Sequence, residues 1–242
     1  MRLFFGILIL LYSLNCFSQK PPKEHKQNSI TLFSGVGFLA VRNEHYDLKK
    51  YSGRQLPIGI EWEKIQKKNF SRCCAYYHSG NIQSGYDDAD IDQLSIAYDY
   101  YFLLKHVSLF GKKASLFAGS KAFIDLRSRE QPSVINSIIF THLNICSLGP
   151  NAYLDYAFSD KFTLSAALGM NLLSYINQAG INKGLVIFNS GFISHNNIEL
   201  EWNMCPRFNV GMRYQSDFYS IKKWETITSG SDLFLLTINY IL

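Results

Sequence analysis

The sequence predicts an all-β protein, a transmembrane antiparallel up-and-down β-barrel of about ten strands. Three observations predict this fold. Strand-like segments follow one another along the chain, their connections alternate between long and short, and apolar and polar residues alternate within them. Bacterial outer-membrane barrels combine an even number of strands, short periplasmic turns and longer external loops with this alternation. A count of eight strands stays open, because the segments at 29–42 and 70–79 are the weakest.

Residues 1–18 resemble a secretory signal peptide. Arg2 supplies a positive charge, a mostly apolar run follows, and Cys16 and Ser18 place small residues where a signal peptidase cuts. The run is too short for a membrane-spanning helix, which needs about 20 residues. A lipoprotein leader with Cys16 as the lipidated residue is the alternative. Residues 19–28 then form a short polar lead-in, and residues 29–242 form the barrel.

The composition fits a barrel and argues against several other classes. Apolar residues make up 47% and aromatic residues 15% of the chain, yet no stretch after the leader could form a membrane helix. The net charge of +5 is mild and the cations do not gather on a helical face, so nucleic-acid binding gains no support. The cysteines after the leader are too sparse for a disulfide scaffold, and their spacing suggests no metal site. We expect unpaired, buried thiols at Cys73, Cys74, Cys146 and Cys205.

Ten segments are predicted as strands. In order they are 29–42, 54–65, 70–79, 92–105, 112–126, 145–158, 161–175, 189–203, 207–218 and 232–242. The short connections are 66–69, 106–111, 159–160 and 204–206. The long connections are 43–53, 80–91, 127–144, 176–188 and 219–231. This order places the start of the first strand and the end of the last strand on the side of the short turns.

The two faces of the strands differ in polarity. From Gln93 onward the even positions are apolar with few exceptions, while the odd positions carry the polar groups. A charge facing lipid costs roughly 2–4 kcal/mol near the midplane, so the even positions should face the membrane. A soluble sandwich also alternates, but its exposed face would be rich in lysine, whereas the odd positions here lean acidic. Arg72 and His78 stand at even positions, so the parity must reverse in 70–79, which we attribute to a bulge.

The odd positions predict a narrow lumen filled by side chains. The expected polar network comprises Glu61, Glu63, Asp99, Lys121, Asp125, Asp155, His195, Glu199, Glu201, Arg213 and Asp217. The expected aromatic girdle at the membrane interface comprises Trp62, Phe158, Phe162, Trp202, Phe208 and Tyr240. Two hairpins predict a register. Phe158 should face Phe162, and Trp202 should face Phe208, which would bring Glu199 diagonally next to Arg213 and within contact distance.

The sequence offers few candidates for chemistry. His78 and Ser79 are neighbours on a strand, so they should point to opposite faces and cannot form a nucleophilic pair. His195 is expected to be a hydrogen-bonded lumen residue near Glu199.

Other candidates concern ions and loops. Asp125 and Asp155, placed near the outer end, could bind a cation, although a network of ion pairs with Lys121 and Arg127 explains them as well. The acidic segment 80–91 should form a flexible external loop. The apolar runs at 134–140 and 185–188 indicate strands that protrude beyond the bilayer, or else a partner surface.

Three stretches carry a family resemblance. They are Gly59-Ile60-Glu61-Trp62, the stretch from Tyr98 to Phe102 that leads to Leu116-Phe117-Ala118-Gly119, and the stretch from Tyr156 to Lys161. With the leader ending in Phe17-Ser18-Gln19, they resemble the small outer-membrane barrels of Bacteroidota-type bacteria and, more distantly, the conjugative-transposon family TraO. The resemblance implies a barrel fold and a role in conjugative transfer. It transfers no functional residue to this chain.

The sequence therefore favours a monomeric, non-enzymatic barrel in the outer membrane that presents its external loops, above all 80–91 and 127–144. The expected partners are outer-membrane lipid and a protein that contacts those loops, with no nucleic acid and no cofactor. A narrow channel, a component of a conjugative apparatus and a lipid-modifying enzyme are the alternatives.

Overall fold

The computed structural model describes residues 26–43, 47–66, 68–85, 87–132, 138–178, 182–223 and 226–242. The predicted signal peptide at 1–18 and most of the lead-in at 19–28 lie outside the described residues. No helix among the described residues is long and apolar enough to cross a membrane.

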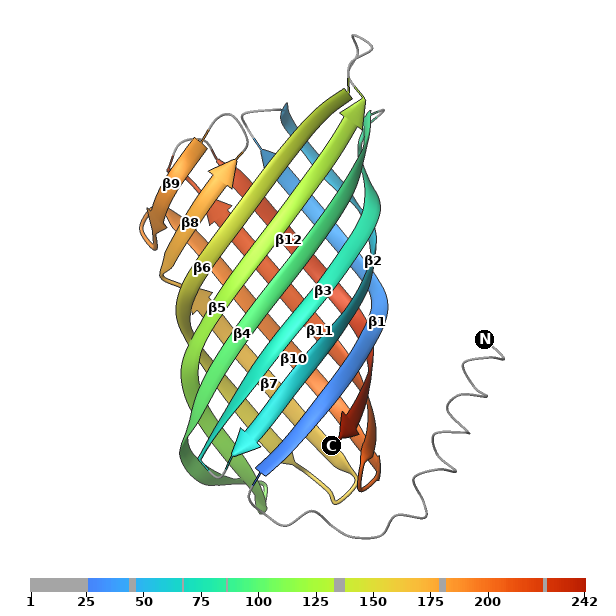
Figure 1. The fold of residues 1–242 in the computed structure, drawn as a ribbon, viewed down its shortest axis with the longest axis vertical. Helices are drawn as coiled ribbons and strands as arrows, with labels where there is room; N and C mark the ends of the chain where they lie inside the picture. Colours follow the sequence, from blue (N-terminus) through green and yellow to red (C-terminus); the bar gives the residue numbers. More distant parts are fainter. Residues whose placement is uncertain are drawn as a thin grey trace, which may run out of the picture.

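The described secondary structure consists of antiparallel β-strands in one sheet (Figure 1). The strands are β1 (Lys26–Asn43), β2 (Asp47–Gln66), β3 (Asn69–Ser84), β4 (Asp87–Leu109), β5 (Lys112–Pro132), β6 (Ile138–Ala157), β7 (Phe162–Asn171), β8 (Leu173–Gln178), β9 (Asn182–Ile187), β10 (Gly191–Cys205), β11 (Phe208–Ile221) and β12 (Ile227–Ile241).

The sheet closes on itself. Its order runs β5-β4-β3-β2-β1-β12-β11-β10-β7-β6, and β6 also pairs with β5 to complete the ring. β8 continues β7 along β6 after an interruption at Leu172, and β9 pairs with β8 at the end of the barrel that carries the longer connections. The barrel thus has ten strand positions, which confirms the predicted fold. We call the end with the barrel's C-terminus and the short turns the periplasmic end, and the opposite end the outer end.

The strands reach farther at the outer end than predicted. β3 ends at Ser84 and β4 begins at Asp87, so residues 80–84 pair with residues 87–91 and the expectation of a flexible loop over 80–91 is wrong. Gly85 makes its tight turn with a φ of +66°. The run at 185–188 falls largely in β9, which confirms a strand there, whereas 133–137 lie outside the described residues.

The exposure of the side chains follows the predicted alternation. On β12, Phe234 and Leu236 are 53% and 62% exposed, whereas Leu233 and Leu235 are 0% and 2% exposed. The apolar outward positions form a belt around the barrel, as expected of a sheet that faces the acyl chains of a membrane. Asp232 is an exception that the pattern did not predict: it stands at an outward position on β12, where the Tyr214 hydroxyl donates to it at 2.6 Å.

The parity reverses in β3, as expected, but no bulge causes the reversal. Ile65 pairs with Phe70 and Ser84 pairs with Asp87, so odd residues face even residues on both sides of β3. Directly opposed residues share a face, and the lengths of the two turns therefore change the parity.

The four cysteines in the described part of the chain are unpaired, and two of them correct the expectation of burial. Cys73 and Cys146 are exposed because they occupy outward positions in the apolar belt, while Cys74 is buried in the lumen and Cys205 is half-buried. Cys73 and its neighbour Cys74 thus point to opposite faces, as predicted.

Candidate functional site

The inward side chains fill the lumen in layers, with apolar clusters at both ends. Near the periplasmic end, Phe70 stacks on Tyr101 with ring centroids 4.5 Å apart, and Phe117, Tyr153 and Ala167 pack around them. Two apolar clusters lie at the outer end. One comprises Leu143, Ile145, Ile176, Val186, Ile193, Tyr219, Ile221 and Ile227, and the other comprises Leu39, Val41, Tyr51, Ile82, Ala89 and Ile91.

A charged cluster lies above the periplasmic aromatic cluster, centred on Arg213. This guanidinium donates to Glu61 at 2.9 and 3.0 Å and to Glu199 at 3.0 and 2.8 Å. Arg72 lies 3.4 Å from Glu61 and 2.8 Å from Glu63. The predicted contact between Glu199 and Arg213 is therefore present.

The register that predicted this contact was wrong by two residues. Trp202 pairs with Val210 rather than Phe208, and Glu199 lies directly opposite Arg213 rather than diagonally. The shift arises from an irregularity between Asn203 and Cys205 that the sequence did not reveal. At the other hairpin Ala157 pairs with Thr163, which places Phe158 across from Phe162 as predicted.

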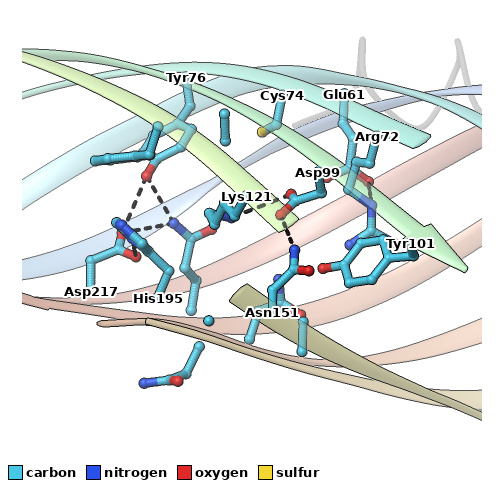
Figure 2. A pocket seen from close by; sticks show the side chains of 17 residues that line it. Glu61, Arg72, Cys74, Tyr76, Asp99, Tyr101, Lys121, Asn151, His195 and Asp217 are labelled. Atoms are coloured by element: carbon cyan, nitrogen blue, oxygen red, sulfur yellow. Dashed lines mark hydrogen bonds and ion pairs between the residues drawn. The ribbon is translucent and has the colours of Figure 1, made fainter. Parts of the chain in front are cut away.

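A small cavity of about 30 Å³ lies in the middle of the lumen (Figure 2). Lys121 approaches Asp99 at 3.3 Å, and the Asn151 amide donates to the same carboxylate at 2.6 Å. Lys121 therefore pairs with Asp99, and not with Asp125 as predicted.

His195 lies on another wall of this cavity. Its Nδ1 is 2.8 Å from Asp217, its Nε2 is 3.3 Å from Asn171, and its ring centroid is 4.1 Å from that of Phe123. Tyr76 donates to Asp217 at 3.2 Å from the opposite side of the lumen (Figure 2). His195 is thus a hydrogen-bonded lumen residue, but its carboxylate partner is Asp217 rather than the expected Glu199.

Asp125 and Asp155 lie in different parts of the lumen. Asp125 approaches Arg127 at 3.5 Å and accepts hydrogen bonds from Gln93 and Ser95, both at 2.8 Å. Asp155 was expected near the outer end, but β6 runs from the outer end inward, so it lies toward the periplasmic end, opposite Ser115 and Ser165. Of the predicted network of Asp125 and Asp155 with Lys121 and Arg127, only the pair of Asp125 with Arg127 is present.

A second cavity, of about 50 Å³, lies at the periplasmic side of the charged cluster. Its lining is polar, and its charged residues are the acids Glu61, Glu63, Asp155, Glu199 and Glu201 and the cations Arg72 and Arg213. Glu201 accepts hydrogen bonds from Asn209 at 2.9 Å and from Asn239 at 3.0 Å. No cluster among the described residues has the three acidic, histidine or cysteine ligands that would hold a metal ion.

The aromatic residues predicted for the girdle differ in exposure. Trp62, Phe158, Phe162 and Trp202 are 36–44% exposed, and the ring of Phe162 lies 5.8 Å from that of Phe158 and 6.4 Å from that of Trp202. Tyr240 is half-buried. Phe208 is only 5% exposed, since it lies beside the register irregularity of β10, so it does not take part in the exposed girdle.

Two pairs of a histidine and a serine could be considered for catalysis, and neither has the arrangement that a catalytic site requires. His78 is fully buried in the lumen, bonded to Gln55 at 3.1 Å, while its neighbour Ser79 lies on the outward parity. Sequence reasoning missed a second pair: His106 Nδ1 lies 3.0 Å from Ser115 Oγ, because an irregularity between Leu103 and Lys105 changes the parity of β4. Within the described residues no carboxylate is paired with His106, as a catalytic triad would require.

Comparisons with known proteins give a fold and no family. No family model matches the chain, and no curated protein matches it. The outer membrane protease OmpT from Escherichia coli has a similar structure, with a TM-score of 0.56 and 10% identity over 93% of this chain and 99% of OmpT. Neisserial surface protein A (TM-score 0.38, 10% identity, 87% and 96% covered) and Ail of Yersinia pestis (0.35, 12%, 91% and 100%) are also similar.

The likeness to OmpT at 10% identity shows the fold alone, so neither proteolysis nor its absence follows. The closed ring of antiparallel strands and the apolar belt define an outer-membrane β-barrel, and this chain belongs to that class and that membrane. The resemblance to TraO and the Bacteroidota origin stay predictions.

Proposed function

We propose that this chain is a non-enzymatic outer-membrane barrel with a sealed lumen, which acts as a structural or interaction protein through its outer end. The filling of the lumen carries the proposal. Buried apolar clusters occupy both ends, and paired charges cross the space between them. A water molecule needs roughly 10–15 Å³ of cavity volume, so cavities of about 30 and 50 Å³ hold only a few waters each.

The outer wall supports the interaction role. Beyond the last outward apolar pair of β4 and β5, Leu94 with Leu126, the outward pairs become Asp92 with Ser128 and Asp90 with Glu130. The strands therefore continue as a polar, hydrogen-bonded wall above the membrane. A rigid wall of this kind presents side chains to a partner without the entropy cost of ordering a flexible loop.

Conductance across a planar lipid bilayer tests the sealed lumen. We expect the purified protein to leave the current at its baseline. The control is a variant with Tyr101, Tyr153, Ile193 and Tyr219 all changed to Ala, which thins the apolar clusters at both ends and should give conducting events once its folding is verified. Discrete single-channel steps from the unmodified protein would establish the channel alternative instead.

Site-specific photocrosslinking in cells tests the interaction role. A crosslinking residue at Asp90, on the outer wall, should yield discrete protein adducts, whereas the same residue at Leu94, in the apolar belt, should yield lipid adducts only. Absence of protein adducts from Asp90, Asp88 and Glu130 alike would contradict an interaction through this wall.

A further inference from the structure

The outward face of β10, β11 and β12 carries an apolar groove. Its volume is about 390 Å³, and its lining comprises Ile198, Leu200, Met212, Tyr214, Phe234 and Leu236 with the backbone between them. The most exposed of these side chains, Leu236 and Met212, are 62% and 61% exposed. We call this depression the β12 groove. It belongs to the apolar belt, so hydrocarbon is the surrounding medium.

A second depression continues the β12 groove toward the outer end. It has a volume of about 330 Å³ and is bounded by Phe38, Ala40, Ser52, Arg54, Gly230 and Asp232, on β1, β2 and β12. Its floor is made of small residues, since Ala40 pairs with both Ser52 and Gly230. We call it the β12 shelf. Along β12, the outward residues Gly230 and Asp232 line the shelf, and the next outward residues, Phe234 and Leu236, line the groove. The hydrogen bond from Tyr214 in the groove to Asp232 on the shelf joins the two depressions.

Basic side chains surround the shelf. Arg54 lines it, and the next outward pair toward the outer end is Arg42 with Lys50. All three are exposed. The outward residues at the corresponding end of β4 are instead acidic, namely Asp88, Asp90 and Asp92, so the outward face is basic at the outer end of β1 and β2 and acidic at the outer end of β4.

We propose that the β12 groove and the β12 shelf together bind one phosphorylated glycolipid of the outer leaflet. Acyl chains lie in the groove, and the headgroup lies on the shelf with its phosphates beside Arg54, Lys50 and Arg42. Arginine and lysine form strong charge-assisted hydrogen bonds with phosphate, and basic pockets at the membrane surface bind anionic headgroups. The Asp232 carboxylate, already bonded by Tyr214, offers its remaining lone pairs to a sugar hydroxyl or an amide N–H.

The small residues of the shelf allow a test that does not disturb the barrel. A Cβ atom added at Gly230 would meet nothing closer than a Phe218 ring carbon at 3.9 Å, so a large side chain can enter the shelf without displacing backbone. Gly230→Phe therefore fills the proposed headgroup position. Ala122→Phe adds the same bulk at an outward position on β5, away from the shelf, and serves as its control.

Native mass spectrometry of the full-length mature barrel in detergent measures the binding. The probes are bis-phosphorylated lipid A and the same lipid with its phosphates removed. We expect one bound phosphorylated lipid, and roughly thirtyfold weaker binding after dephosphorylation or in K50E/R54E, since each of the two basic residues near a membrane surface contributes about 1 kcal/mol. K112E/K113E, which changes two exposed lysines at the periplasmic end, should bind as the unmodified protein does.

Folding of each variant is checked by the heat-dependent mobility of the barrel in detergent gels. Equal binding of the two lipids would overturn the proposal, as would unchanged binding by folded G230F and K50E/R54E. The unmodified chain could instead form a dimer without a lipid adduct, and G230F could abolish that dimer. This result would show that a second copy of the chain occupies the groove, and it would also overturn the proposal.

Discussion

Arg213 on β11 donates hydrogen bonds to both carboxylate oxygens of Glu61 on β2, at 2.9 and 3.0 Å. The contact passes through the lumen, because β1 and β12 separate these two strands in the sheet. Both side chains are buried, with 3% and 5% of their surface exposed. The pair therefore bridges two strands that are not neighbours in the sheet through the interior of the barrel, and it adds to the filling of the lumen.

Removing the cation alone should destabilise the barrel strongly. Arg213→Met leaves Glu61 and Glu199 buried beside each other, and breaking a buried ion pair from one side costs about 3–5 kcal/mol. Changing all three residues to Met should restore most of the stability, because a buried ion cluster contributes little over apolar packing. Urea unfolding in lipid vesicles, followed by tryptophan fluorescence, measures both variants. Equal stability of R213M and the unmodified barrel would contradict this view of the cluster.

Two glycines should respond in opposite ways to the same substitution. A Cβ atom at Gly59 would lie 2.3 Å from the Phe33 ring and 2.7 Å from the Cβ of Tyr76, inside the packed lumen. Overpacking of this kind costs about 1–3 kcal/mol, so Gly59→Ala should lower the free energy of unfolding by that amount. Gly230→Ala enters open space and should change it by less than about 0.5 kcal/mol. Urea unfolding in lipid vesicles measures the free energy of unfolding of both variants. Equal losses of stability at the two positions would count against the described packing.

Thiol labelling on intact cells should distinguish the outer wall from the apolar belt. Asp90→Cys, in a chain whose own cysteines are changed to Ser, should react with a membrane-impermeant maleimide because it stands on the polar wall above the belt. The native Cys146, kept as the only thiol, is exposed but faces acyl chains and should stay unlabelled. Labelling of Cys146 without labelling of D90C would reverse the proposed arrangement.

Much of the fold could be predicted from the alternation of apolar and polar residues, because every strand of a closed sheet in lipid turns alternate side chains toward the acyl chains and toward the lumen. The Glu199 and Arg213 contact could also be predicted, since their strands are joined by a short hairpin. Contacts across the lumen, such as Tyr76 with Asp217, could not, because they join residues 141 positions apart with no hairpin to set their register.

The differences between the predicted and the observed strands have local causes. The outer ends of the strands were mistaken for loops because they lack apolar outward residues, although their backbones remain paired. The parity of β3 depends on the lengths of two turns, and the register of β10 depends on one irregularity near Asn203. The even positions of Arg72 and His78 reveal the parity reversal but not its cause, and the irregularity near Asn203 leaves no periodic signal in the sequence.

The most direct test of the account is the environment of successive residues along β12. Single spin labels placed at 233 through 238 of the reconstituted barrel report collisions with oxygen, which is enriched in hydrocarbon, and with a water-soluble nickel complex. We predict that positions 234, 236 and 238 contact oxygen, while 233, 235 and 237 are shielded from both reagents by the packed lumen. Strong nickel contact at the odd positions would show an open, water-filled interior, and nickel contact at the even positions would show that this face does not lie in lipid.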